Sequence, residues 1–353
     1  MRDASYAFLK SLLSTPGPSG YEGRAAKVWR EEAAKFADVR GDRMGNSFAT
    51  LGKGGSPKIM LSGHIDEIGL IVTHIDEKGL VYFKGVGGWD SQVLVGQRAR
   101  LQTKNGDEVV GVIGKKAIHL MSAEDRKKVS QIKDLWIDIG AKDREEAESL
   151  VRVGDVAVLD HDVLELANGR IASRSLDNRM GAFVVLEALR LLSEEDSVSA
   201  EVVAVASVQE EIGLNGARGA AFGLDPDAAI AVDVTHATDV PGVSKNEHGD
   251  HALGSGPVIT RGSTLSPFVT EGLISAAERE GIPYSLEADS TRTGTDADAI
   301  HLSRAGVATG VVSSPNRYMH SPNEVVELDD LENCAKLITS YVKTLSADTN
   351  FVR

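Results

Sequence analysis

Four continuous apolar runs along the chain predict short strands that are buried on both faces. They cover residues 58–62, 202–208, 228–232 and 307–312. Runs of this length, which lack the alternation of a half-solvated strand, are typical of a sheet covered on both sides. Apolar residues with helical spacing occur at 5–13, 25–36, 182–192 and 331–344. This order of strands and helices predicts an α/β fold.

The hydrophobic pattern changes between about Ile68 and Leu166. Short strand candidates and turn signals alternate there, at 69–75, 76–79, 80–83, 98–102 and 104–107. The last turn contains Asn-Gly, which is a strong hairpin signal. We therefore expect an inserted β-rich domain at 68–166, with 1–67 and 167–353 forming the main domain. The alternative is a β-rich lobe that packs on the main sheet and has no oligomeric role.

Side chains able to bind metals follow the predicted strands. They are His64 and Asp66, Glu210 and Glu211, Asp233, and, after a loop, His320. In open α/β sheets, ligands bind beyond the carboxyl ends of the strands. We therefore expect His64, Glu211, Asp233 and His320 at one edge of the sheet.

Two adjacent carboxylates, Glu210 and Glu211, end a strand that is predicted to be buried. Buried charges must be paired or must hold a metal. Neighbouring residues on an extended backbone face opposite sides, so one can bind a metal while the other handles a proton. The pattern does not decide which does which, and a solvated turn is the alternative. Asp177, just before the helix at 182–192, is a fifth candidate ligand, or else a carboxylate of the first helical turn.

Two imidazoles and three carboxylates suit zinc, cobalt or a similar divalent ion. Five ligands are too many for one tetrahedral zinc and fit two ions that share a bridging ligand. His236 and His301 lie near the expected site in the sequence and compete for assignment.

Seven motifs along the chain together resemble the M42 family of metallo-aminopeptidases, which are tetrahedral and self-compartmentalising. The motifs lie at 18–22, 62–69, 175–179, 209–213, 232–236, 294–297 and 317–321. The resemblance implies a zinc-peptidase-like mixed central sheet flanked by helices. It also implies that the insert is a small PDZ-like β-barrel used for dimerisation.

The resemblance also implies a role for each candidate residue. Terminal metal ligands would be His64, Glu211, Asp233 and His320, with Asp177 bridging two divalent ions, Glu210 as general base and acid, and Asp66 hydrogen-bonded to His64. Zinc is the expected metal and cobalt the alternative. Such ions lower the pKa of bound water to about 7, and Glu210 would pass the water's proton to the leaving amine. A cis peptide bond is expected between Asp177 and Asn178.

The implied activity is release of N-terminal residues from short peptides, by dimers that assemble into a dodecamer. A di-metal deacylase or carboxypeptidase is one alternative. A glycan-active protein is another, but glycosidases need only two carboxylates and no metal pair. The segment 291–296 either lines the substrate pocket or is a simple turn. The preferred N-terminal residue does not follow from the sequence.

The composition argues against some classes of binding partner and indicates the cellular compartment. The net charge of −14, from 38 basic and 52 acidic residues, argues against nucleic acid or an anionic membrane surface. The single cysteine, Cys334, permits no intramolecular disulfide. Residues 1–6 show no signal-peptide pattern, and no apolar run has transmembrane length. A cytoplasmic protein is expected.

Overall fold

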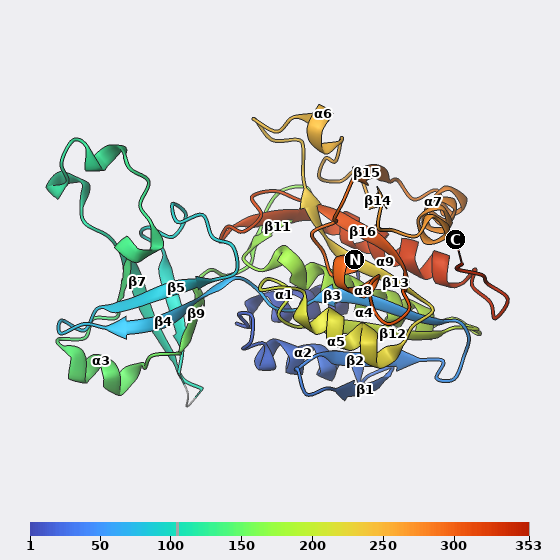
Figure 1. Cartoon of the computed structure of the whole chain (residues 1–353), viewed down its shortest axis with the longest axis horizontal. Helices are drawn as coiled ribbons and strands as arrows, with labels where there is room; N and C mark the ends of the chain where they lie inside the picture. Colours follow the sequence, from blue (N-terminus) through green and yellow to red (C-terminus); the bar gives the residue numbers. More distant parts are fainter. Residues whose placement is uncertain (104–105, 353) are drawn as a thin grey trace.

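The computed structural model describes residues 1–103 and 106–352. An α/β unit makes up most of the described chain, and a β-barrel projects from one end of it (Figure 1). No helix formed by the described residues is both long enough and apolar enough to cross a bilayer.

The central sheet of the α/β unit has eight strands in the order β1-β2-β12-β3-β13-β16-β14-β15. Their bounds are β1 Asp38–Gly41, β2 Ser47–Leu51, β3 Lys58–His64, β12 Glu201–Ser207, β13 Ala228–His236, β14 Val258–Gly262, β15 Ser285–Asp289 and β16 Ala308–Asn316. The four predicted apolar runs are the central parallel strands β12, β3, β13 and β16, and antiparallel strands lie outside them. The expectation of an α/β fold with a mixed sheet is confirmed.

Helices cover both faces of this sheet. One face carries α1 Asp3–Ser14, α2 Gly23–Ala33, α4 Leu176–Ser193, α7 Pro267–Glu280 and α9 Leu328–Val342, and the other carries α5 Asn215–Leu224 and α8 Ala297–Ile300. Alternation along β3 shows the division, because Ile59 and Leu61 join the larger core whereas Met60 joins the core under α5. The short helix α6 Lys245–His248 lies at the surface (Figure 1).

The barrel closes in the order β4-β5-β8-β7-β6-β9 and has its own apolar core. Its elements are β4 Gly69–Ile75, β5 Val81–Val86, β6 Arg98–Gln102, β7 Glu108–Gly114, β8 Trp136–Asp138, β9 Val156–Leu159 and α3 Arg144–Leu150. Lys104 and Asn105, in the predicted turn 104–107, lie outside the described residues. A third sheet joins β10 Leu164–Glu165, β11 Arg170–Ser173 and β17 Glu324–Glu327. The domain boundaries at 67/68 and 166/167 stay a prediction.

Three helix details differ from the sequence patterns. The second helix ends at Ala33 and gives way to turns before residue 36, and α4 starts at Leu176, six residues before the apolar periodicity. The third is the start of α7, where the pair Ser266-Pro267 has the sequence pattern of a capped helix start; Pro267 does begin the helix, but the Ser266 side chain makes no capping hydrogen bond. Apolar periodicity identifies the buried face of a helix, but it does not locate the terminal turns, where the packing differs.

Candidate metal centre

The parallel strands bring the predicted ligands to one edge of the central sheet. His64 is the last residue of β3, and Asp233 lies in the neighbouring strand β13. Glu210 and Glu211 follow β12, and His320 lies in the loop after β16. Because these four strands are parallel, their carboxyl ends meet at the same edge, as expected from the sequence.

Asp177 reaches this edge from the start of α4. The helix packs so closely on β3 that a side-chain carbon at Gly63 would lie 2.4 Å from the backbone of Gly181. Asp177 and Asn178 have non-helical backbone angles inside the first turn, so Asp177 is not an ordinary helix-capping carboxylate. The peptide bond between these two residues is cis, as predicted.

The two carboxylate oxygens of Asp177 face two different imidazoles. Its Oδ1 lies 3.2 Å from Nε2 of His64, and its Oδ2 lies 3.2 Å from Nε2 of His320. A carboxylate shared in this way has the arrangement that a bridging ligand needs between two ions.

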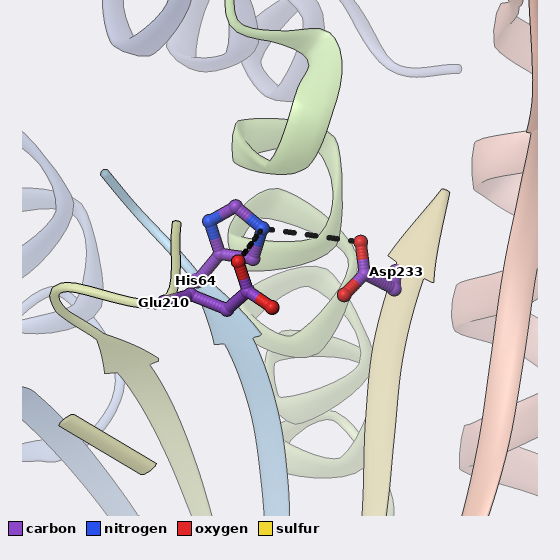
Figure 2. Close-up of side chains that lie close together, drawn as sticks. All are labelled: His64, Glu210 and Asp233. Carbon is purple, nitrogen blue, oxygen red and sulfur yellow. Dashed lines mark ion pairs between the residues drawn. The ribbon is translucent and has the colours of Figure 1, made fainter. Parts of the chain in front are cut away.

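Three further carboxylates complete the cluster around the imidazoles. Asp233 Oδ1 is 3.9 Å and Glu210 Oε2 is 3.6 Å from Nε2 of His64, and Figure 2 shows both side chains directed toward that nitrogen. Glu211 Oε1 is 3.4 Å from Nε2 of His320. Two groups of metal-binding atoms therefore overlap at His64, one with Glu210 and Asp233 and the other with Asp177 and Glu211.

The two competing histidines lie apart from this cluster. His236, at the end of β13, is exposed on the wall of the same cavity. His301 turns its Nδ1 to the carbonyl oxygen of Ala297, 2.8 Å away, and faces a different cavity. Neither belongs to a group of clustered metal-binding atoms among the described residues.

The charge balance of the cluster fits a bound cation. Burial, with Asp233 nearby, raises the pKa of Glu210 to about 10, and burial also raises the pKa of Asp233 well above its usual value. Burial alone would raise the pKa of Asp177 too, but the hydrogen bonds from His320 and His64 outweigh it and hold the pKa low. The buried Glu211 Oε1 has no hydrogen-bond partner. A cation bound among these groups would favour the ionised form of the carboxylates and would give Glu211 Oε1 a partner.

Asp66 is hydrogen-bonded to the loop after β12 that carries Glu210 and Glu211. Its Oδ1 lies 3.4 Å from Nδ1 of His64, the predicted partner, which is longer than an ordinary N–H···O hydrogen bond. The carboxylate instead accepts hydrogen bonds from the backbone N–H groups of Glu210 (3.1 Å) and Glu211 (3.2 Å) and from the hydroxyl of Ser19 (2.6 Å). Through these bonds Asp66 fixes the loop that carries both glutamates.

Glu22 supports the same loop from α2's N-terminal end. Its Oε1 accepts a hydrogen bond from the N–H of Gln209, 3.1 Å away, where the backbone has a positive φ of 56°. Burial raises the pKa of Glu22 to about 7. The sequence motif at 18–22 contained this residue, but nothing in the pattern indicated what it touches.

Glu324, on β17, was not predicted and contacts two of the predicted ligands. Its Oε2 accepts from the backbone N–H of Asp177 and its Oε1 from that of His320, both at 2.9 Å. His320 Nδ1 also donates to the carbonyl oxygen of Gly88, 2.8 Å away, in the segment after β5. That bond leaves Nε2 of His320 free to bind a metal, and it links the barrel to the cluster.

A cavity of about 350 Å³ opens over the cluster. It is lined by His64, Asp177, Glu210, Glu211, Asp233 and His320, and it continues to β14, β15 and the segment 293–295. The predicted pocket-lining role of 291–296 therefore holds for Thr293, Gly294 and Thr295. A larger cavity, of about 930 Å³, lies at the other ends of the strands and contains none of the predicted site residues.

Known proteins resemble this chain over nearly its whole length. A sequence profile described as M42 glutamyl aminopeptidase matches residues 45–337. The lysyl aminopeptidase of Pyrococcus furiosus is 36% identical over 346 residues, which are 96% of this chain and 97% of that protein.

Solved structures agree with the sequence comparison. The TET aminopeptidase of Thaumarchaeota archaeon SCGC AB-539-E09 superposes with a TM-score of 0.93 at 36% identity, covering 98% of this chain and 97% of that one. The TET1 peptidase of Pyrococcus horikoshii, described as able to assemble into a tetrahedron or a large octahedral shell, gives a TM-score of 0.86 at 35% identity. That alignment covers 97% of this chain and 100% of that one.

Proposed function

The chain belongs to the M42 family of aminopeptidases and is a peptide hydrolase, and on this premise we propose that it removes N-terminal residues from short peptides at the cluster beneath the 350 Å³ cavity. The observation that carries the proposal is Asp177, whose two oxygens each lie 3.2 Å from a different imidazole. That arrangement suits a centre of two ions.

We assign the metal ligands by the imidazole that each carboxylate approaches, except that Glu210, which also lies near His64, is assigned to proton transfer because the family resemblance implies that role. His64 and Asp233 would hold one divalent ion, His320 and Glu211 the other, and Asp177 would bridge them. Metal dependence is expected for the family, and zinc, with cobalt as the alternative, suits imidazole and carboxylate ligands. When bound, such ions polarise the scissile carbonyl and make the attacking water more acidic.

Glu210 is the proposed proton-transfer group. It lies on the cavity wall beside His64, whereas Asp177 and Glu211 are engaged by His320. From there its carboxylate would take the proton of the attacking water and pass it to the leaving amine. Asp66 and Glu22 would hold the loop that aims it, through the N–H groups of Glu210, Glu211 and Gln209.

The barrel is the proposed dimerisation element, within an insert at 68–166, and dimers would build a dodecamer. A similar protein assembles into closed shells, which supports this proposal. On β7 the apolar side chains of Val110 and Val112 are about half exposed, at 52% and 49%. Exposed apolar side chains grouped on one strand favour an interface between proteins. We expect these assemblies in the cytoplasm.

A panel of aminoacyl chromogenic substrates tests the activity. The protein is stripped of metal and reloaded with Zn²⁺ or Co²⁺, and each substrate is paired with its N-acetylated form. Hydrolysis of the free-amine substrates, dependent on added metal, is expected. Hydrolysis of the acetylated forms instead would contradict the proposal and favour a deacylase.

A further inference from the structure

The cavity over the metal centre ends in an acidic wall formed by β15. Glu287 and Asp289 line it, two residues apart on the same face of that strand. β14 pairs with β16 only at Val258 and Ile259, so the two edge strands separate from the sheet beyond that point. This places Thr260 and the acidic residues of β15 in the cavity wall near the end of β13.

Two hydroxyl groups hold the Glu287 carboxylate in place. Thr235 Oγ1 donates to its Oε1 at 2.9 Å, and Thr260 Oγ1 donates to its Oε2 at 3.4 Å. Both threonines are buried. The carboxylate is thus oriented by neutral donors, which leave its charge uncompensated.

No Lys or Arg of the described residues neutralises this wall. Neither Glu287 nor Asp289 forms an ion pair with a described Lys or Arg, and no described Lys or Arg lines the cavity. Burial raises the pKa of Asp289, and the charge of Glu287 raises it further. A positively charged group entering the cavity would relieve this repulsion, whereas a negatively charged one would add to it.

The acidic wall is set apart from the proposed metal ligands, because Glu287 contacts Thr235 and not a ligand. Thr235 is two residues beyond Asp233 on β13, which separates their backbones by about 6.6 Å. An N-terminal side chain with a four-carbon stem and a terminal ammonium spans such a gap. Val311 and Met319 line the cavity and provide apolar contacts for a stem of this kind.

We propose that Glu287 and Asp289 form the end of the subsite for the first side chain of the peptide, and that the enzyme prefers N-terminal Lys or Arg. The inference rests on the proposed aminopeptidase function. Hydrogen bonds to charged groups are strong enough to give a preference of about ten- to a hundredfold in kcat/KM.

The first test compares lysyl, arginyl, norleucyl and glutamyl chromogenic substrates on the metal-loaded wild-type protein. Norleucine has the same four-carbon stem as lysine without the ammonium group. We expect kcat/KM for lysyl and arginyl substrates to exceed that for norleucyl by tenfold or more, with glutamyl lowest. A norleucyl or glutamyl preference would overturn this inference and leave the aminopeptidase function standing. Absence of any hydrolysis would instead contradict the aminopeptidase function.

The second test measures the lysyl-to-norleucyl ratio of kcat/KM in Glu287→Gln and Asp289→Asn. The ratio is expected to fall about tenfold or more in Glu287→Gln. The matched control is Glu195→Gln. Glu195 is exposed, lies just after α4 and pairs with Lys343, so this variant should keep the wild-type ratio. An unchanged ratio in both cavity variants would overturn the proposal.

A third measurement needs no variant and covers the case in which the substitutions impair folding. Raising the salt concentration screens the attraction between the wall and a cationic side chain. The lysyl-to-norleucyl ratio of the wild-type protein should therefore fall as salt increases. A ratio independent of salt would contradict an electrostatic basis for the preference.

Discussion

Substitution of Glu324 by Gln should weaken metal binding, although Glu324 is not a proposed ligand. Its carboxylate accepts one N–H from Asp177 and one from His320, both at 2.9 Å, and the side chain is 2% exposed. A glutamine amide can accept only one of these donors and turns its own NH₂ toward the other. An unpaired buried N–H costs about 1–3 kcal/mol, which corresponds to roughly 5- to 150-fold in an equilibrium constant.

We therefore expect the metal affinity of Glu324→Gln to fall by about 10- to 100-fold, which is also the usual effect of losing a group that orients a metal ligand. The assay titrates the metal-free protein with Zn²⁺ against a competing chelator, and circular dichroism confirms that the variant is folded. Glu327→Gln is the matched control, because Glu327 lies on the same strand and pairs with Arg170 instead. Wild-type metal affinity in a folded Glu324→Gln protein would refute the reasoning.

Three other predictions address proton transfer, assembly and pH. Glu210→Gln should lower kcat by about 10²–10⁴-fold while both metals stay bound. A decrease in kcat smaller than about tenfold, in protein whose metal content has been measured, would refute the role of Glu210. Val112→Asp, which places a charge on the exposed face of β7, should shift the mass in solution toward monomers, and an unchanged assembly would count against the barrel as the dimer contact. Burial raises the pKa of Asp330 from 3.8 to about 6, so the folded protein keeps a proton that the unfolded chain loses between these values. The contribution of Asp330 to the free energy of unfolding should thus fall as pH rises from about 4 to about 6. In denaturant titrations over this range, the free energy of unfolding of wild type relative to Asp330→Asn should therefore fall as pH rises; an equal slope in the two proteins would contradict this assignment.

The sequence predicts the central strands and most of the metal centre for one physical reason. A strand buried on both faces must be apolar along its whole length, so a polar residue such as His64 or Asp233 at its end stands out. Parallel strands then bring those ends together without further information. Asp177 is different, because its pattern fits an ordinary helix start, and only the resemblance to a family indicated a bridging role.

The groups that orient the ligands could not be predicted from the sequence, because they contact residues that are far away in the chain. Glu324 reaches Asp177 across 147 residues, and His320 reaches Gly88 across 232. These bonds go to backbone N–H and C=O groups, which leave no mark on the residue pattern. The hydrogen bonds from Glu210 and Glu211 to Asp66 could not be predicted for the same reason, since their donors are backbone N–H groups.

The acidic wall shows a related limit. No apolar run predicted a strand at 285–289, yet β15 runs from Ser285 to Asp289 and carries both acidic residues of the cavity. Edge strands are half exposed and weakly patterned, so their position depends on how the sheet twists. Here β14 pairs with β16 only at Val258 and Ile259, and Glu287 lies within hydrogen-bonding distance of Thr235 on a strand that is not its neighbour.

The central claim, two metal ions bridged by Asp177, is tested most directly by anomalous diffraction from crystals of the zinc- or cobalt-loaded protein. The account predicts two peaks per subunit roughly 3.5–4 Å apart, one beside His64 and Asp233 and the other beside His320 and Glu211, with one oxygen of Asp177 directed to each. A single peak, or two peaks that Asp177 does not join, would contradict it.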